Sequence, residues 1–155
     1  MSTTAILVAD FENFPRSYSL LREVDNTLRS LNIRVIRRLG FHFYADKIPA
    51  PFEPVTVSYE LARRVYGRHY VLAFEKHVNN QLVDTLLIDT TRSILEIEDY
   101  DYIVLLASDN HYSILANMRP LIVFSTRIAR KLLYVSEKYY LCEKYGKHWI
   151  CERKK

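Results

Sequence analysis

Two acidic residues directly follow short apolar segments of the chain. Asp10 ends the run 5–9, and Asp109 closely follows the run 102–107. Both runs are rich in branched aliphatic residues, a pattern typical of strands that are covered on both faces. In open α/β sheets, ligands bind at the carboxyl ends of such strands. Asp10 and Asp109 are therefore candidates for chemistry at one edge of a sheet.

A third acid, Asp84, opens a segment with helical periodicity, 82–97. If the strands that end at Asp10 and Asp109 are neighbours, the chain leaves them on opposite sides and a crevice forms between them. All three carboxylates are then expected to converge there. Simpler roles stay open, because Asp84 also suits the helix dipole, and Ser108 or Asp109 would suit the cap of the next helix.

Three adjacent carboxylates raise one another's pKa values and destabilise a fold unless a cation lies among them. Hard oxygen ligands suit Mg²⁺ or Mn²⁺, with water and substrate phosphate completing the coordination. Such an ion activates a water molecule and neutralises charge that develops on a phosphodiester. The three acids thus predict a divalent metal site.

The elements that must position these acids alternate between strands and helices. Strands are expected at 5–9, 33–44, 69–74, 102–107 and 121–125, and helices at 15–31, 58–66, 82–97, 112–118 and 126–135. A proline-rich loop is expected at 47–54 and a polar loop at 75–81. This alternation predicts a three-layer α/β/α sandwich with a mainly parallel, five-stranded sheet.

The C-terminal segment 139–155 has the pattern of a β-hairpin that turns at Gly146 and Lys147. This register places Cys142 opposite Cys151, with Cα atoms about 4.5 Å apart, which is within disulfide range. We predict that the two cysteines are close; whether they are oxidised depends on the compartment. One domain is expected over 1–136, with 137–155 as a hairpin extension packed on it.

Composition excludes some classes of protein. The chain has 155 residues, a formal net charge of +4, and three glycines that lie far apart, so it has no glycine-rich phosphate loop. No apolar run approaches the roughly 20 residues that span a bilayer, and no targeting segment is visible. We expect a soluble, cytoplasmic protein without a membrane partner. The basic excess is compatible with a polyanionic partner, and the C-terminal tyrosines suit either a homodimer interface or packing of the hairpin.

Three motifs resemble the NYN domain, a branch of the PIN-like nuclease superfamily: V-A-D-F-E-N at 8–13, V-D at 83–84 and I-V-L-L-A-S-D-N-H-Y at 103–112. The resemblance implies a Rossmann-like sheet of strand order 3-2-1-4-5. It also implies that Asp10 with Asn13, Asp84 and Asp109 surround Mg²⁺ or Mn²⁺ and cleave RNA or, less often, DNA.

The chain departs from the family pattern at four positions. Gln81 and Leu82 stand where Lys and Gly are common, Ser108 replaces a glycine, and His111 replaces the second acid of the last motif. Imidazole can bind Mn²⁺ or act as a base, whereas loss of a negative charge should weaken Mg²⁺ binding. His111 is thus either an accessory to the site, as Glu12 would be, or a surface residue at the start of a helix.

Basic side chains on the expected helices and loops would hold a nucleic-acid backbone, or they are simply solvated. They are Arg63, Arg64, Arg68, Arg127, Arg130 and Lys131. Two hypotheses result: a metal-dependent endoribonuclease of NYN type, and a catalytically inactive PIN-like protein that binds nucleic acid or acts as an adaptor.

Overall fold

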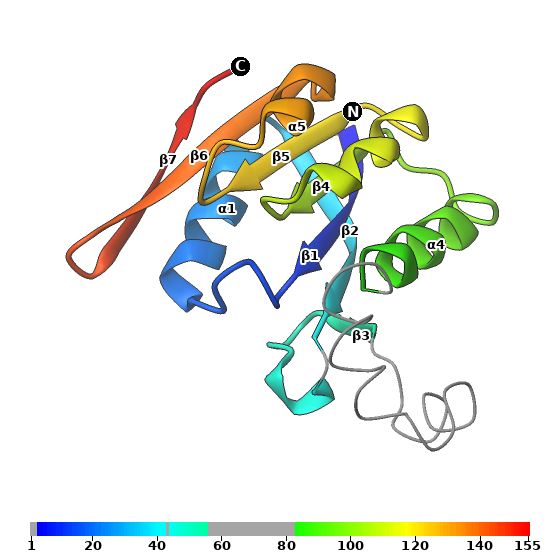
Figure 1. The fold of residues 1–155 in the computed structure, drawn as a ribbon, viewed down its shortest axis with the longest axis horizontal. Coiled ribbons are helices and arrows are strands. Elements are labelled where there is room, and N and C mark those ends of the chain that lie inside the picture. The colour runs from blue at the N-terminus through cyan, green and yellow to red at the C-terminus, as the bar shows by residue number, and fades with distance from the viewer. Residues whose placement is uncertain (1–2, 43, 56–82) are drawn as a thin grey trace.

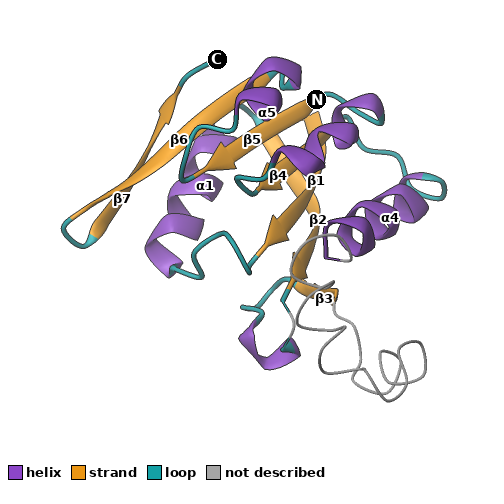
Figure 2. Ribbon diagram, in the orientation of Figure 1, coloured by secondary structure: helices purple, strands orange, loops and turns teal. Residues whose placement is uncertain are grey.

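The computed structural model describes residues 3–42, 44–55 and 83–155, which form an α/β fold built on one mainly parallel sheet (Figures 1 and 2). The strands are β1 (Thr3–Asp10), β2 (Ile33–Phe41), β3 (Glu53–Val55), β4 (Tyr102–Leu106), β5 (Leu121–Ser125), β6 (Lys138–Tyr145) and β7 (His148–Arg153). The helices are α1 (Tyr18–Ser30), α4 (Val83–Leu95) and α5 (Arg130–Val135), with 3₁₀ helices η1 (Ala45–Lys47) and η4 (Asn110–Asn117). The strand order is β3-β2-β1-β4-β5-β6-β7, and only β7 runs antiparallel to its neighbour.

The two acid-bearing strands are neighbours at the centre of the sheet, as predicted. β1 and β4 pair in parallel, with Ala9 opposite Leu106. Every residue from Ala5 to Asp10 is fully buried. The chain after β1 and the chain after β4 therefore leave the same edge of the sheet.

Helices cover both faces of the sheet, each over its own apolar core. On one face α1 buries Leu20, Val24 and Leu28. On the other face α4, η4 and α5 pack over a second core. The prediction that α1 begins near Pro15 is wrong: the helix begins at Tyr18, because Ser17 accepts a hydrogen bond from the backbone N–H of Leu20 at 3.4 Å and caps it.

A β-bulge in β2 sets the face to which Leu39 and Phe41 point. Val35 lies opposite Ala5 but Arg37 lies opposite Ile6, so Ile36 is an extra residue. An extra residue exchanges the faces of all later side chains. Leu39 and Phe41 consequently pack on the α4 face. Asp10, which pairs with Phe41, shares that face, where η4 also lies.

The sheet is wider than the five strands predicted. The C-terminal hairpin continues it, since β6 pairs in parallel with β5 and β7 pairs with β6. The segment expected to be a loop contributes β3, which pairs with the end of β2. The predicted strand 69–74 and helix 58–66 lie outside the described residues. No helix in the described part of the chain is long and apolar enough to cross a membrane.

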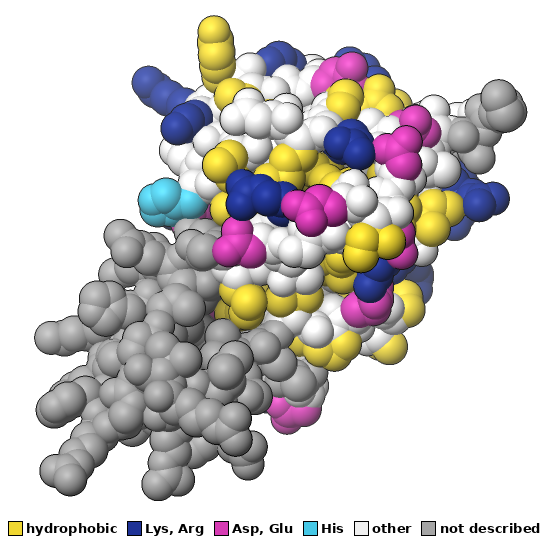
Figure 3. All heavy atoms as spheres, turned by 90° about the vertical axis from the view of Figure 1, so that its right-hand side faces the viewer, with side chains coloured by type: hydrophobic (Ala, Val, Ile, Leu, Met, Phe, Trp, Pro, Cys, Tyr) yellow, Lys and Arg dark blue, Asp and Glu magenta, His cyan; other side chains and the backbone are white. Residues whose placement is uncertain are grey.

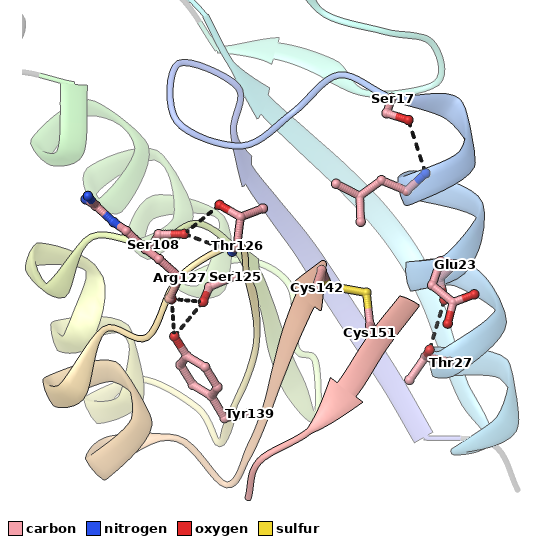
Figure 4. The surroundings of a disulfide bond; sticks show 11 residues. Ser17, Glu23, Thr27, Ser108, Ser125, Thr126, Arg127, Tyr139, Cys142 and Cys151 are labelled. Carbon is pink, nitrogen blue, oxygen red and sulfur yellow. Dashed lines mark hydrogen bonds between the residues drawn. A yellow bond between two sulfur atoms is a disulfide. The ribbon is translucent and has the colours of Figure 1, made fainter. Parts of the chain in front are cut away.

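The hairpin has the predicted register and carries a disulfide. Cys142 and Cys151 lie opposite each other, with Cα atoms 3.9 Å apart, and are bonded (Figure 4). Gly146 has a φ of +61°, which glycine adopts at little cost. Tyr139 anchors the hairpin: its buried hydroxyl lies within hydrogen-bond distance of Ser125 and of the backbone of Arg127. β6, which carries Tyr139, is thus part of the hydrophobic core.

Candidate active site at the carboxyl ends of β1 and β4

Asp10 is a fully buried carboxylate held by three donors. Its Oδ1 accepts the backbone N–H of Glu12 at 3.0 Å. Its Oδ2 accepts the side-chain amide of Asn13 at 3.1 Å and the hydroxyl of Tyr112 at 2.8 Å. The predicted pairing of Asn13 with Asp10 is thus present, and it orients the carboxylate within the turn after β1.

Tyr112 is the contact that sequence reasoning missed. It lies in η4, 102 residues from Asp10, and its side chain is completely buried. The two meet because η4 follows β4, the neighbour of β1, on the face toward which Asp10 points. The sequence offered one sign of this contact. Residue 112, three positions after Asp109, is a tyrosine, whereas a phenylalanine would fill a purely apolar position.

Burial raises the pKa of Asp10 above its ordinary value of 3.8. The hydrogen bonds from Tyr112, Glu12 and Asn13 oppose this shift, and the nearby charge of Glu12 adds to it. Desolvation disfavours the charged form of an acid, whereas an adjacent cation favours it. A cation beside Asp10 would therefore stabilise the ionised carboxylate.

Asp109 lies at the same edge and caps η4. Its Oδ1 accepts the backbone N–H of His111 at 2.9 Å and lies 2.9 Å from the Nδ1 of that ring. The capping alternative is thus confirmed, but capping uses one carboxylate oxygen only. Oδ2 has no hydrogen bond to any residue that the structure describes. The Asp109 side chain is 29% exposed and that of His111 is 67% exposed, so both face solvent.

Two further polar residues after β4 serve the fold. Ser108 accepts the backbone N–H of Thr126 at 3.1 Å and so joins the ends of β4 and β5 (Figure 4). Asn110 accepts the backbone N–H groups of Lys131 and Leu132 at 3.1 and 3.3 Å, at the start of α5. These bonds fix the loop from which Asp109 projects.

Glu12 and His42 form a second pair at this edge. The Nε2 of His42 lies 3.4 Å from a carboxylate oxygen of Glu12. The Nδ1 of His42 accepts the backbone N–H of Tyr44 at 3.0 Å, which leaves Nε2 to face Glu12. His42 was not anticipated from the sequence, because it lies inside a segment expected to be a continuous strand.

The other predicted site residues differ in what the structure says of them. Asp84 is the second residue of α4, and its side chain is not among those that the structure describes. The helix contacts β1, β3 and η4 and begins near the carboxyl ends of β1 and β2 (Figure 1). Arg127, Arg130 and Lys131 are exposed, and the backbone N–H of Lys131 donates to the side chain of Asn110. Arg63, Arg64, Arg68, Gln81 and Leu82 lie outside the described residues.

No family model and no curated protein sequence matches the chain. We therefore infer function from the geometry of this edge.

The oxygen ligands at this edge fit a divalent cation in their chemistry. Within the described ranges, no three His, Cys, Asp or Glu side chains lie close enough to hold a metal ion. Asp10 and Asp109 follow neighbouring strands, and the side chain of Asp84, the third predicted ligand, is not among those described. Each carboxylate has about four lone pairs, so the three bonds to Asp10 leave capacity on Oδ1. Two or three carboxylates with water are a usual environment for Mg²⁺ or Mn²⁺.

Replacing Tyr112 by Phe tests whether its hydroxyl supports the buried carboxylate. We expect the variant to lose about 1.5 kcal/mol of unfolding free energy, because a hydrogen bond to a charged group contributes this much and the ring itself is retained. Urea unfolding at neutral pH measures the loss. Tyr134→Phe is the matched control, since Tyr134 is 83% exposed and should not change stability. Equal stability of Tyr112→Phe and wild type would contradict the assignment.

Proposed function

We propose that this protein is a metal-dependent endoribonuclease of NYN type, on a three-layer PIN-like fold. One observation carries the proposal: Asp10 and Asp109 lie at the carboxyl ends of neighbouring parallel strands, and the helix that bears Asp84 begins at the same edge. In α/β folds this is where ligands bind. The NYN-like motifs fall on these same three elements.

Each residue has a proposed role. Asp10, Asp84 and Asp109 would hold Mg²⁺ or Mn²⁺, which supplies an activated water and neutralises charge on the phosphodiester. Asn13 positions Asp10 through its 3.1 Å hydrogen bond. His111 is exposed beside Asp109 and is placed to exchange a proton with substrate or water.

Basic residues at the same edge would bind the RNA backbone. Arg127, Arg130 and Lys131 are exposed, and Lys131 is bonded through its backbone to Asn110, the residue after Asp109. Arg63, Arg64 and Arg68 remain predicted contacts from the sequence. RNA is favoured over DNA as the partner through the resemblance to NYN domains.

A second candidate function has its own supporting observation. The Asp10 carboxylate is fully buried and has three hydrogen-bond donors, so the fold can hold it without a cation. This arrangement would suit a catalytically inactive PIN-like protein that binds nucleic acid or acts as an adaptor, because such a protein requires no metal ion. It would bind RNA without cleaving it and without a requirement for metal.

The deciding experiment is a cleavage assay on end-labelled, single-stranded RNA with Mn²⁺, Mg²⁺ or EDTA, with single-stranded DNA in parallel. We expect cleavage with metal and none with EDTA. Asp109→Asn should lower the rate at least tenfold, on the order of the loss seen when a group near a metal is altered.

The matched control is Asp89→Asn, because Asp89 is an exposed acid on α4 that pairs with Arg92 and lines a hollow that includes neither Asp10 nor Asp109. It should cleave like wild type. A folded wild-type protein that is inert with both metals would favour the second function. Cleavage unaffected by Asp109→Asn would rule out the proposed role of that residue.

A further inference from the structure

A basic groove lies between α1 and β2. Two hollows of about 360 and 390 Å³ adjoin there and share Asp25, Arg29 and Arg38 as lining residues. We call them together the α1–β2 groove. Its basic lining residues are Arg22, Arg29, Arg34 and Arg38.

The positive charge of this groove is mostly uncompensated. Asp25 is the only acid among its lining residues in the described part of the chain, and it pairs with Arg38 at 3.0 Å. Arg22, Arg29 and Arg34 are exposed and have no ion-pair partner among the residues described. Clustered cations without counter-charges raise the local concentration of polyanions.

On the face over α4, in contrast to the groove, the basic side chains are paired with acids. There Arg37 pairs with Glu53 and Glu98 at 2.8 and 2.9 Å, and Arg92 pairs with Asp89 at 3.1 Å. In Figure 3, which turns the α4 side of the molecule to the viewer, basic and acidic side chains lie beside one another. Charge of one sign is concentrated at the groove.

Aromatic rings lie at one end of the groove. Tyr18 is 73% exposed and lines the hollow together with Pro51 and Phe52. The Arg38 guanidinium lies 5.9 Å from the centre of the Phe52 ring. An exposed ring beside guanidinium groups is the arrangement that binds unpaired bases and their phosphates. Duplex nucleic acid has no unpaired base to place on Tyr18.

We propose that the α1–β2 groove binds single-stranded RNA, with Arg22, Arg29 and Arg34 on the phosphates and a base stacked on Tyr18. The groove uses the α1 face of the sheet, whereas Asp10 points to the α4 face. RNA binding here does not require cleavage, and it holds equally for the nuclease and for the inactive protein.

The test is fluorescence anisotropy of labelled oligouridine with the full-length protein in EDTA, which keeps hydrolysis out of the measurement. The principal variant is Arg29→Gln with Arg34→Gln. Each phosphate contact with a single strand changes the slope of the log association constant against the log salt concentration by about 0.7. We therefore expect the loss of two contacts to weaken oligouridine binding about 25-fold near 0.1 M salt. The matched control is Lys144→Gln with Lys147→Gln, which removes the same charge from the exposed hairpin.

Tyr18→Ala separates RNA from other polyanions. It should weaken oligouridine binding about tenfold through lost stacking without changing the salt slope, and it should leave heparin binding unchanged. Circular dichroism and urea unfolding establish that each variant is folded. Where the double variant is not, Arg34→Gln alone carries the test, with half the change in slope.

Three results would overturn the proposal: equal losses for the groove and hairpin variants, a Tyr18→Ala protein that binds oligouridine like wild type, or tighter binding of duplex DNA than of oligouridine. Because these measurements are made in EDTA, none of them depends on whether the protein cleaves RNA. A protein that does not cleave RNA would not contradict RNA binding at the groove. Likewise, a groove that does not bind RNA would not contradict cleavage at the candidate metal site.

Discussion

Asp10→Asn is expected to reduce metal-dependent RNA cleavage by two to three orders of magnitude without unfolding the protein. A loss of about 10²–10³ is typical when a preorganised electrostatic group is removed from an active site. The amide oxygen of Asn can take the place of Oδ2 and accept the hydroxyl of Tyr112 and the side-chain amide of Asn13, so two of the three hydrogen bonds persist. The bond from the backbone N–H of Glu12 is lost, because the amide nitrogen that replaces Oδ1 cannot accept it. The charge that would hold the cation is lost.

The same substitution should change how stability depends on pH. Since burial raises the pKa of Asp10 above 3.8, the folded protein binds this proton more tightly than the unfolded chain does. Where the folded state binds more protons, unfolding free energy falls as pH rises. In wild type, proton binding by Asp10 contributes its full stabilisation below pH 3.8. That contribution falls as the pH rises through the raised pKa and does not change further above it. The amide of Asp10→Asn cannot titrate, so the variant should gain stability relative to wild type across that window.

Metal binding gives an independent measure of the same site. A ligand that binds only the folded state adds about 2.7 kcal/mol at 100 times its Kd. Mn²⁺ should therefore raise the urea midpoint of wild type and of the control Asp89→Asn, but not that of Asp10→Asn. If Mn²⁺ stabilises Asp10→Asn as much as wild type, Asp10 does not hold the ion. If no protein responds to Mn²⁺, the inactive function is favoured.

The positions of the two acids could be predicted because the information is local. Buried parallel strands read as continuous apolar runs, so the ends of β1 and β4 were visible in the sequence together with Asp10 and Asp109. The hairpin register was equally local, since a two-residue turn at Gly146 places Cys142 opposite Cys151. The same reasoning located α4, and with it the backbone of Asp84.

Other features depend on contacts between distant segments. The hydrogen bond from Tyr112 to Asp10 requires both the β1–β4 register and the turn of η4. The bulge at Ile36 appears in the sequence only as an interrupted alternation, yet because of it Phe41 lies on the same face of the sheet as its neighbour Asp10. The hairpin joined the sheet because the free edge of β5 was available to β6, which a single strand pattern cannot reveal.

The disulfide accounts for the other large expected effect. Replacing Cys142 and Cys151 by Ser should lower the unfolding free energy by about 2.6 kcal/mol, because the bond closes a loop with a sequence separation of nine and restricts the unfolded chain. The folded state also contributes: Cys142 is buried, and Trp149 and Cys151 pack with α1 over the core on that face. β7 pairs with β6 alone among the described strands, so the covalent link secures the outermost strand of the sheet.

Urea unfolding with and without reductant measures this effect and contains its own control. Reductant should lower the stability of wild type to about that of the double Ser variant, and it should leave the variant unchanged. Thiol titration of the denatured protein without reductant should find no free thiol in wild type. Two free thiols would show that the pair is reduced in solution, and the stability difference should then shrink to the small cost of two Cys-to-Ser changes. Because the disulfide lies on the α1 face and the candidate metal site on the other, RNA cleavage by the folded Ser variant should match wild type.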